Sequence, residues 1–325
     1  MSEPLNPYAA LYDVPAQGPG DARPTALQIV KDNDALGKWQ SRVALVTGGT
    51  SGIGIPTVQA LHATDADVYF TARDMKKKKK EPVVERIRKE SPGKGKMEAI
   101  LMDMDSLESV KEGAHAFLDL SGGKLNFLVN NAGIMGPPKG STKEGFELQF
   151  GVNHLAHFVL TALLLPTLTR SSTPEFNSRV VNPGVYQPFV AYGQSKTANI
   201  WMADYIDRVF GPRGIHATSV HPGAILSGLY VHADEATKQQ WAANPKIMAE
   251  MQTPEQGAAT STWAVVGRAW EGRGGKYLVA CTVAPPTDDF TSVLSKGFAP
   301  HAYDVEGEDR LWKLSEELTG VRAAL

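Results

Sequence analysis

The chain is poor in cysteine and has no excess of charge of either sign. Cys281 is the single cysteine among 325 residues, which excludes an internal disulfide and a zinc site built from several thiolates, and suits a reducing compartment. The 33 basic and 35 acidic side chains leave no global field that would recruit nucleic acid or an anionic membrane. We therefore expect a small-molecule substrate as the partner, no nucleic acid and no metal site.

Long hydrophobic runs are also lacking. No stretch approaches the ~18 uninterrupted apolar residues that a membrane span requires. The first 40 residues are polar and interrupted by proline, without the apolar core of a signal peptide. We expect a cytoplasmic protein in which residues 1–40 form a flexible or surface-draped arm with one short helix, and residues 41–325 form one domain.

The hydrophobic residues that are present, 42% of the chain, alternate between strand and helix patterns. The predicted strands are 43–46, 67–72, 98–102, 125–129, 179–181, 217–220 and 277–280. The predicted helices are 25–39, 53–62, 107–118, 146–168, 192–210, 253–266 and 309–318. This alternation predicts an α/β fold, a single doubly wound parallel sheet of about seven strands with helices on both faces. The less regular stretch 224–256 is predicted to be a lid-like insertion on the substrate side.

The stretch 43–54, VALVTGGTSGIG, joins the first predicted strand to a helix through a glycine-rich turn. Glycine lets the backbone turn sharply and lie against a pyrophosphate, whose negative charge the free N–H groups and the helix dipole attract. The turn predicts a dinucleotide-binding loop, although a merely structural turn explains such a motif equally well when it stands alone.

A second motif, AYGQSKTAN, places Tyr192 four residues before Lys196. Positions i and i+4 share one face of a helix, so the phenol and the ammonium would lie side by side. A nearby cation stabilises the phenolate and lowers the pKa of tyrosine, which makes it a usable proton donor or acceptor. This spacing is common by chance, but together with the glycine turn and the NNAG segment at 130–133 it predicts a proton-transfer site.

Taken together, these motifs resemble those of the short-chain dehydrogenase/reductase superfamily over about residues 43–318. The matching segments are TGGTSGIG at 47–54, the aspartate after the third strand, NNAG at 130–133, the asparagine of FGVNHLAHF, YGQSK at 192–196 and HPG at 221–223. The segments FGVNHLAHFVLT and AYGQSKTANI are most similar to those of the branch of retinol dehydrogenase-like and WW-domain oxidoreductase-like enzymes, which includes many fungal members. The resemblance implies hydride transfer between a nicotinamide cofactor and a carbonyl or secondary alcohol.

The resemblance also implies three catalytic residues. Tyr192 would exchange a proton with the substrate oxygen, and Lys196 would bind the nicotinamide ribose and lower the pKa of Tyr192. Asn153 would hold a water in a proton relay, or would only pin neighbouring segments. The helices at 146–168 and 192–210 are those that such enzymes often pair in homodimers.

Cofactor contacts are implied along the same motifs. The glycine turn would cradle the pyrophosphate, Asp103 would meet the adenine amino group and Asn130 would support the adenosine side, or would only pin strands. Ser227 could contact the nicotinamide amide, or only cap a turn. The full set is Gly48, Thr50, Ser51, Gly52, Ile53, Gly54, Arg73, Asp103, Asn130, Ala132, Gly133, Tyr192, Lys196, Pro222, Gly223 and Ser227.

The end of the second predicted strand decides the cofactor. An acidic residue there binds the ribose 2′-hydroxyl of NAD, whereas an arginine accommodates the 2′-phosphate of NADP. The strand ends at Arg73, and Thr50 and Ser51 add hydroxyls that could touch the phosphate, so NADP is predicted. Asp74 follows directly and keeps NAD as the alternative.

One family feature is missing. The family places a serine just after the fifth strand, whose hydroxyl polarises the reacting carbonyl. This chain reads RVVNPGVYQPFVAYGQSK there, with no serine or threonine between Ser178 and Ser195. Asn182 or Tyr186 could substitute, or the protein could hold the cofactor with impaired or non-redox activity, or a coding segment could be missing. Because Tyr192 and Lys196 are retained, the oxidoreductase is favoured.

Apolar and aromatic side chains in 224–251, together with Phe298 and Trp312, suggest a lipophilic substrate. The same side chains fit an ordinary core equally well.

Overall fold

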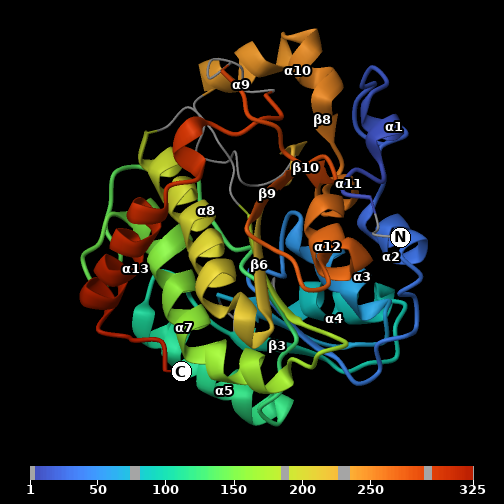
Figure 1. Ribbon diagram of the computed structural model, residues 1–325. Coiled ribbons are helices and arrows are strands. Elements are labelled where there is room, and N and C mark those ends of the chain that lie inside the picture. Colours follow the sequence, from blue (N-terminus) through green and yellow to red (C-terminus); the bar gives the residue numbers. More distant parts are fainter. Residues whose placement is uncertain (1–3, 74–80, 184–189, 226–234, 289–294, 325) are drawn as a thin grey trace.

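The computed structural model describes residues 4–73, 81–183, 190–225, 235–288 and 295–324. At its centre is an eight-stranded sheet in the order β10-β9-β6-β5-β4-β1-β2-β3, with helices on both faces (Figure 1). The strands are β1 (Val43–Val46), β2 (Asp67–Ala72), β3 (Met97–Leu101), β4 (Phe127–Val129), β5 (Ser178–Pro183), β6 (Ile215–His221), β9 (Lys276–Val279) and β10 (Thr282–Val283). All seven predicted strands are present, and the parallel, doubly wound sheet is confirmed.

The eighth strand, β10, pairs antiparallel with β9 at the edge of the sheet. Ala280 and Cys281 form the two-residue turn between them, both with a φ of 52°. Positive φ at both central residues is the geometry of a tight hairpin, which usually selects glycine or asparagine. Neither residue type is present, so this turn could not be predicted from local residue preferences.

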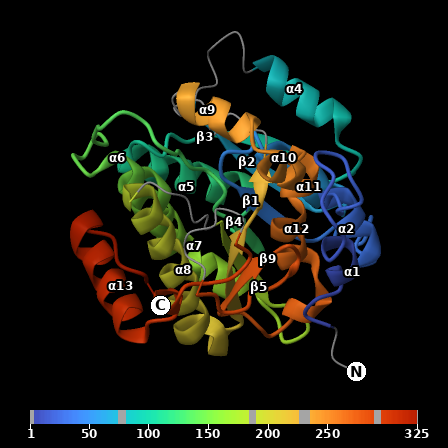
Figure 2. The same cartoon turned by 90° about the horizontal axis from the view of Figure 1, so that it is seen from above.

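Alternate side chains of each strand enter one of two cores. Val46 of β1 packs with α2 (Ala26–Asp32), α3 (Gly54–His62), α4 (Glu81–Glu90) and α12 (Ala259–Val266) on one face. Leu45 packs with α5 (Leu107–Ser121), α7 (Ala156–Ser171), α8 (Val190–Phe210) and α13 (Val305–Thr319) on the other (Figure 2). The period of two along a strand produces this division.

The strand order reverses at β1, which lies between β2 and β4. In open α/β sheets, ligands bind in the crevice at the carboxyl ends of the strands at such a switch point. The glycine turn leaves β1 at this end, and the NNAG segment leaves β4 beside it.

The long apolar helix predicted at 146–168 is not continuous. It consists of α6 (Leu148–Phe150), a π-helical turn at Gly151–Leu155 and α7. Single π-turns occur frequently at functional sites. The whole stretch Leu148–Ser171 is the one described helix long and apolar enough to cross a membrane, but 83% of that window is buried inside the protein, as in a core helix.

The C-terminal helix α13 lies across α7 and α8. Trp312 stacks on Tyr205 with ring centroids 4.2 Å apart and meets Phe158 edge-on at 4.9 Å. Trp312 is 5% exposed, so it belongs to the core and not to a substrate wall. Part of the surface of α8 is therefore covered by α13, and the expected homodimer stays a prediction.

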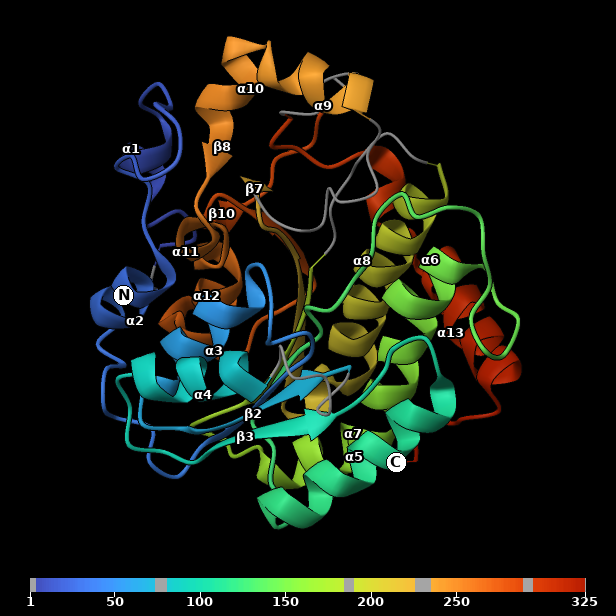
Figure 3. The ribbon, with the colours of Figure 1, turned by 180° about the vertical axis from the view of Figure 1, so that it is seen from behind.

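Two segments lie outside the sheet and its covering helices. The N-terminal arm carries α1 (Ala9–Tyr12) and leads into α2, and Tyr8 and Arg23 within it are buried. The insertion at 224–256 contains β7 (Ala224–Ile225), α9 (Glu235–Ala242), α10 (Pro245–Glu250) and β8 (Met251–Gln252), and ends in the short helix α11 (Pro254–Gly257). Figure 3 shows α9 and α10 beyond the main body of the fold, with α1 next to β8.

Candidate active site

The glycine turn after β1 has the close approaches that exclude side chains. Gly48 and Gly52 have φ values of 67° and 54°. A Cβ at Gly54 would lie 2.2 Å from the carbonyl oxygen of Gly48. The hydroxyl of Thr71 on β2 accepts a hydrogen bond from the Gly48 N–H at 3.0 Å and fixes the start of the turn. The turn therefore fits the compact backbone cradle that a pyrophosphate requires.

The other predicted residues of this turn surround the cradle. Ser51 is exposed and Thr50 is half-buried, so both hydroxyls lie near the surface. Ile53 is partly buried and packs against the core on the α3 face.

Tyr192 and Lys196 lie on one face of α8, as predicted. Tyr192 is 1% exposed and Lys196 7%, and the Lys196 Nζ atom lies 5.2 Å from the centroid of the Tyr192 ring. Burial lowers the pKa of Lys196 to about 8. With a pKa near 8 the lysine is mostly charged at neutral pH, and it lies beside the phenol.

Asn153 lies in the π-turn and connects two segments. Its Oδ1 accepts from the Ile134 N–H at 2.9 Å, and its Nδ2 donates to the Ile134 carbonyl at 3.0 Å and to Ser195 Oγ at 3.1 Å. Ser195 donates in turn to the Tyr192 carbonyl at 2.7 Å. Asn153 thus joins the segment after β4 to the turn of α8 that carries Tyr192.

Asn153 and Lys196 meet beside Gly133, and Tyr192 lies next to Lys196. A Cβ at Gly133 would lie 3.2 Å from Asn153 Oδ1 and 3.4 Å from Lys196 Nζ. Ala132, the preceding residue, approaches the glycine turn, because a Cβ at Gly48 would lie 3.0 Å from the Ala132 Cα. The NNAG segment therefore lies between the predicted cofactor cradle and the predicted catalytic residues.

His157 completes this network, and sequence reasoning did not find it. Its Nδ1 lies 2.9 Å from the Asn153 carbonyl oxygen and its Nε2 lies 2.9 Å from Thr47 Oγ1. A carbonyl can only accept, so Nδ1 carries the proton and Nε2 accepts from the Thr47 hydroxyl. Burial lowers the pKa of His157 to about 3, which keeps the imidazole neutral. Its position four residues after Asn153, on the same helix face, was the available signal.

The residues predicted to choose the cofactor lie at the ends of β2 and β3. Arg73 is exposed at the end of β2. Asp103 follows β3 and is half-buried, with Oδ1 accepting from the Asp105 N–H at 3.2 Å. Asp74 and Ser227 lie outside the described residues.

Asn130 is turned into the protein. Its amide nitrogen donates to Thr161 Oγ1 at 3.1 Å and to Asn182 Oδ1 at 2.8 Å, and the residue is 2% exposed. These contacts pin β4 to β5 and to α7, so the strand-pinning interpretation of Asn130 describes the side chain better than an adenosine contact.

Asn182, one of the two proposed substitutes for the missing serine, is held inside the sheet. The residue is 1% exposed, its Oδ1 accepts from Asn130, and its Nδ2 lies 3.5 Å from the Asn199 carbonyl. Burial and these contacts argue against Asn182 as the substitute donor, and the suggestion stays untested. Tyr186, the other candidate, lies outside the described residues.

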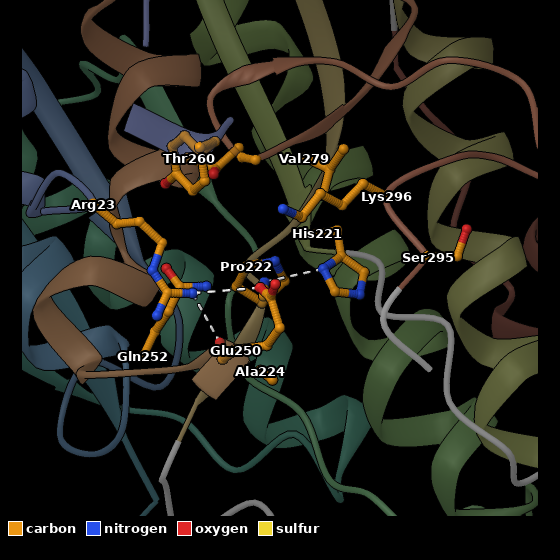
Figure 4. A pocket seen from close by; sticks show the side chains of 13 residues that line it. Arg23, His221, Pro222, Ala224, Glu250, Gln252, Thr260, Val279, Ser295 and Lys296 are labelled. Carbon is orange, nitrogen blue, oxygen red and sulfur yellow. Dashed lines mark hydrogen bonds and ion pairs between the residues drawn. The ribbon is translucent and has the colours of Figure 1, made fainter. Parts of the chain in front are cut away.

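The HPG turn follows β6 at the same end of the sheet. Gly223 has a φ of 89° and its N–H donates to His221 Nδ1 at 3.0 Å. Pro222 and Gly223 line a cavity of about 40 Å³ together with residues of the N-terminal arm and of the insertion (Figure 4). Among the residues that the structure describes, no group of three or more His, Cys, Asp or Glu side chains is placed to hold a metal ion.

Known proteins are similar to this chain in both sequence and fold. The family model for short chain dehydrogenases matches residues 42–238. A short-chain dehydrogenase/reductase of Penicillium roqueforti, prx1, is 44% identical over 316 residues, covering 92% of this chain and 91% of the relative. Human polyprenol dehydrogenase is 33% identical over 302 residues, covering 86% of each chain.

The solved structures give the same result. A Pseudomonas aeruginosa structure described as an RhlG/NADP active-site complex has a TM-score of 0.62 at 28% identity, covering 74% of this chain and 95% of that one. An uncharacterised protein of Mycobacterium paratuberculosis has a TM-score of 0.64 at 26% identity, covering 90% and 98%. The chain belongs to the short-chain dehydrogenase/reductase family.

Proposed function

We propose that the protein is an NADP-dependent oxidoreductase that transfers hydride between the nicotinamide and a carbonyl or secondary alcohol of a lipophilic small molecule. The observation that carries this proposal is the meeting of Lys196 and Asn153 beside Gly133, next to the glycine turn, with Tyr192 against Lys196. A binding protein would need the turn, but it would not need a phenol and a charged lysine buried together.

The chain's own residues supply proton transfer and binding, while bound NADP(H) would supply or accept the hydride. Tyr192 would give its phenolic proton to the developing alkoxide. Lys196, charged at neutral pH, would stabilise the phenolate that remains and bind the nicotinamide ribose. Asn153 and Ser195 hold this turn of α8 at a fixed distance from the NNAG segment.

NADP is proposed over NAD because Arg73 is exposed at the end of β2, where it can pair with a 2′-phosphate. The hydroxyls of Thr50 and Ser51 lie near the surface of the adjacent turn. Two structural neighbours at 27–28% identity are described as NADP complexes, which supports the same choice. The glycine turn, the NNAG segment and the HPG turn are proposed to hold the rest of the cofactor.

A lipophilic substrate is proposed from the relatives and from the insertion. One relative is named for a polyprenol, a long apolar alcohol. Phe298, which packs edge-on against Tyr303 at 4.8 Å, remains a candidate for the substrate wall. We also propose a cytoplasmic location, which a fluorescent fusion would test.

A second candidate function is a protein that binds NADP(H) with impaired or non-redox activity. The observation that favours it is the missing serine, together with the engagement of Asn182 inside the sheet. Loss of one such donor typically lowers the rate by on the order of 10²-fold or more.

One experiment separates the two functions. NADPH consumption is followed with a panel of aldehydes, ketones and quinones, with Tyr192→Phe as the matched variant and with NADPH and NADH titrations alongside. We expect turnover that Tyr192→Phe removes and tighter binding of NADPH than of NADH. Tight NADPH binding without turnover on any compound would favour the second function.

A further inference from the structure

The N-terminal arm is fastened to the insertion by one buried arginine. Arg23 has a side chain only 4% exposed, and it reaches the place where α10 ends and β8 begins. Its guanidinium donates five hydrogen bonds, to Asp21 Oδ1 at 2.8 Å and to the backbone carbonyls of Glu250 at 2.9 Å, Met251 at 2.8 Å, Ala249 at 3.3 Å and Gly18 at 3.3 Å. Three of these carbonyls lie at the end of α10, where a helix leaves its last C=O groups without intrahelical partners.

The charge of Arg23 is balanced within the arm. Burial alone would raise the pKa of Asp21, but hydrogen bonds from the Arg23 side chain and from two backbone N–H groups lower it to about 2. Asp21 is therefore ionised at all working pH values and forms a buried ion pair with Arg23 at 2.8 Å.

Gln256 closes the same junction from the other side. Its Nε2 donates to Asp21 and to the Arg23 carbonyl at 3.1 Å, and its Oε1 accepts from the N–H groups of Gly20 at 2.9 Å and Thr253 at 3.1 Å. The arm thus contacts the chain on both sides of β8. Arg23 binds the end of α10, which precedes β8, and Gln256 of α11, which follows β8, binds the arm.

A single strand separates this junction from the HPG turn. β8 pairs with β7 in the register Ala224↔Met251 and Ile225↔Gln252, and β7 starts directly after Gly223. The Gln252 side chain lies against the turn, because a Cβ at Gly223 would come 2.0 Å from Gln252 Nε2. Figure 4 shows Arg23, Glu250 and Gln252 facing His221 and Pro222 across the cavity.

We propose that Arg23 is a positioning residue for the substrate side of the active site, holding β8 against β7 and so fixing both the HPG turn and the base of α9 and α10. The proposal rests on the proposed oxidoreductase function. The N-terminal arm is accordingly part of the active-site architecture rather than a surface extension. The HPG turn is only one of the proposed cofactor contacts, and the glycine turn and Arg73 lie elsewhere in the fold. Loss of the arm's contacts should therefore weaken substrate binding more than the binding of NADPH.

Amide hydrogen exchange of the full-length protein tests the fastening. Arg23→Met removes all five hydrogen bonds, and Arg23→Lys is a milder variant should the first fail to fold. We expect exchange in 245–256 to rise at least tenfold in Arg23→Met and less in Arg23→Lys. The matched control is Arg268→Met, which removes an exposed arginine paired with Asp34 at 3.4 Å and should leave these peptides unchanged. Wild-type exchange in Arg23→Met would overturn the proposal.

Rescue and kinetics test the positioning role. In Arg23→Ala, guanidinium at 20 mM should restore protection of 245–256, since the vacated space opens onto the cavity of Figure 4. With decanal as the probe, Arg23→Met should raise KM at least tenfold, with smaller changes in kcat and in the Kd of NADPH. Lost protection with an unchanged KM would overturn the positioning role.

A wild-type protein that turns over no carbonyl compound would count against the proposed function and not against the fastening. The positioning role is then tested by amide hydrogen exchange, as the slowing of exchange in residues 221–225 when NADPH is added. We expect Arg23→Met to lose this protection, and its retention at the wild-type level would overturn the proposal.

Discussion

Acid should weaken the fold through its buried histidines, and His157 allows this effect to be isolated. The imidazole is 1% exposed, and burial lowers its pKa from 6.5 to about 3. In the unfolded chain the same group takes up a proton as the pH falls through 6.5. The folded-state pKa is the depressed one, so the contribution to stability is complete above pH 6.5 and is lost progressively as the pH falls from there toward 3.

The size of the effect follows from linkage. At pH 5 the imidazole is neutral in the folded protein but protonated in the unfolded chain. This difference lowers the free energy of unfolding by about 2 kcal/mol relative to pH 7.5. Between pH 7.5 and pH 5 the free energy of unfolding should fall in both proteins. We expect the fall in His157→Gln to be smaller than the fall in the wild type by about 2 kcal/mol. Glutamine keeps one donor and one acceptor for the Asn153 carbonyl and the Thr47 hydroxyl.

Urea unfolding at pH 7.5 and pH 5.0 measures this difference. His115→Gln, at an exposed position of α5, is the control and should lose as much stability as the wild type. If His157→Gln also loses as much stability as the wild type, the imidazole is protonated in the folded protein and the tautomer assigned to it is refuted.

Three further outcomes follow from the structure. Arg73→Ala should weaken NADPH binding by about 10- to 100-fold and leave NADH binding nearly unchanged, because a charge-assisted contact is lost; fluorescence titration of both cofactors measures this. Gly54→Ala should destabilise the glycine turn by about 1–3 kcal/mol, since its Cβ would lie 2.2 Å from the Gly48 carbonyl, and equal NADPH affinity and thermal stability would contradict the cradle. Because α13 packs over α8, one of the two helices expected to form a homodimer, light scattering should give the mass of a monomer, 35.0 kDa, and a mass twice as large would show that a dimer forms despite this packing.

The sequence predicted the regular elements well because hydrophobic periodicity is a local signal. The seven predicted strands are present with ends within two residues of their predicted positions. The glycine turn and the Tyr192–Lys196 pair have the local geometry that their spacing indicated. Features that depend on tertiary contacts were missed. The π-turn at Gly151–Leu155 leaves no trace in the apolar pattern of its helix.

The polar network of the site was predicted only in part for the same reason. Asn130 donates a hydrogen bond to Asn182 across neighbouring strands, which only the strand register brings together. Trp312 looked like a candidate substrate contact, and its burial against Phe158 and Tyr205 depends on how α13 packs on the rest of the fold. The N-terminal arm looked polar and loosely attached, yet Arg23 is buried through contacts with residues more than 220 positions away.

The most direct test of the central claim is the transfer of hydrogen itself. The protein is incubated with NADPH carrying deuterium at both C4 positions of the dihydronicotinamide and with an aldehyde that the panel identifies as a substrate, and the alcohol is analysed by mass spectrometry. We predict one deuterium on the carbinol carbon with the wild type and loss of product with Tyr192→Phe, whose NADPH affinity should remain. Product without deuterium, or equal product from Tyr192→Phe, would contradict hydride transfer assisted by Tyr192.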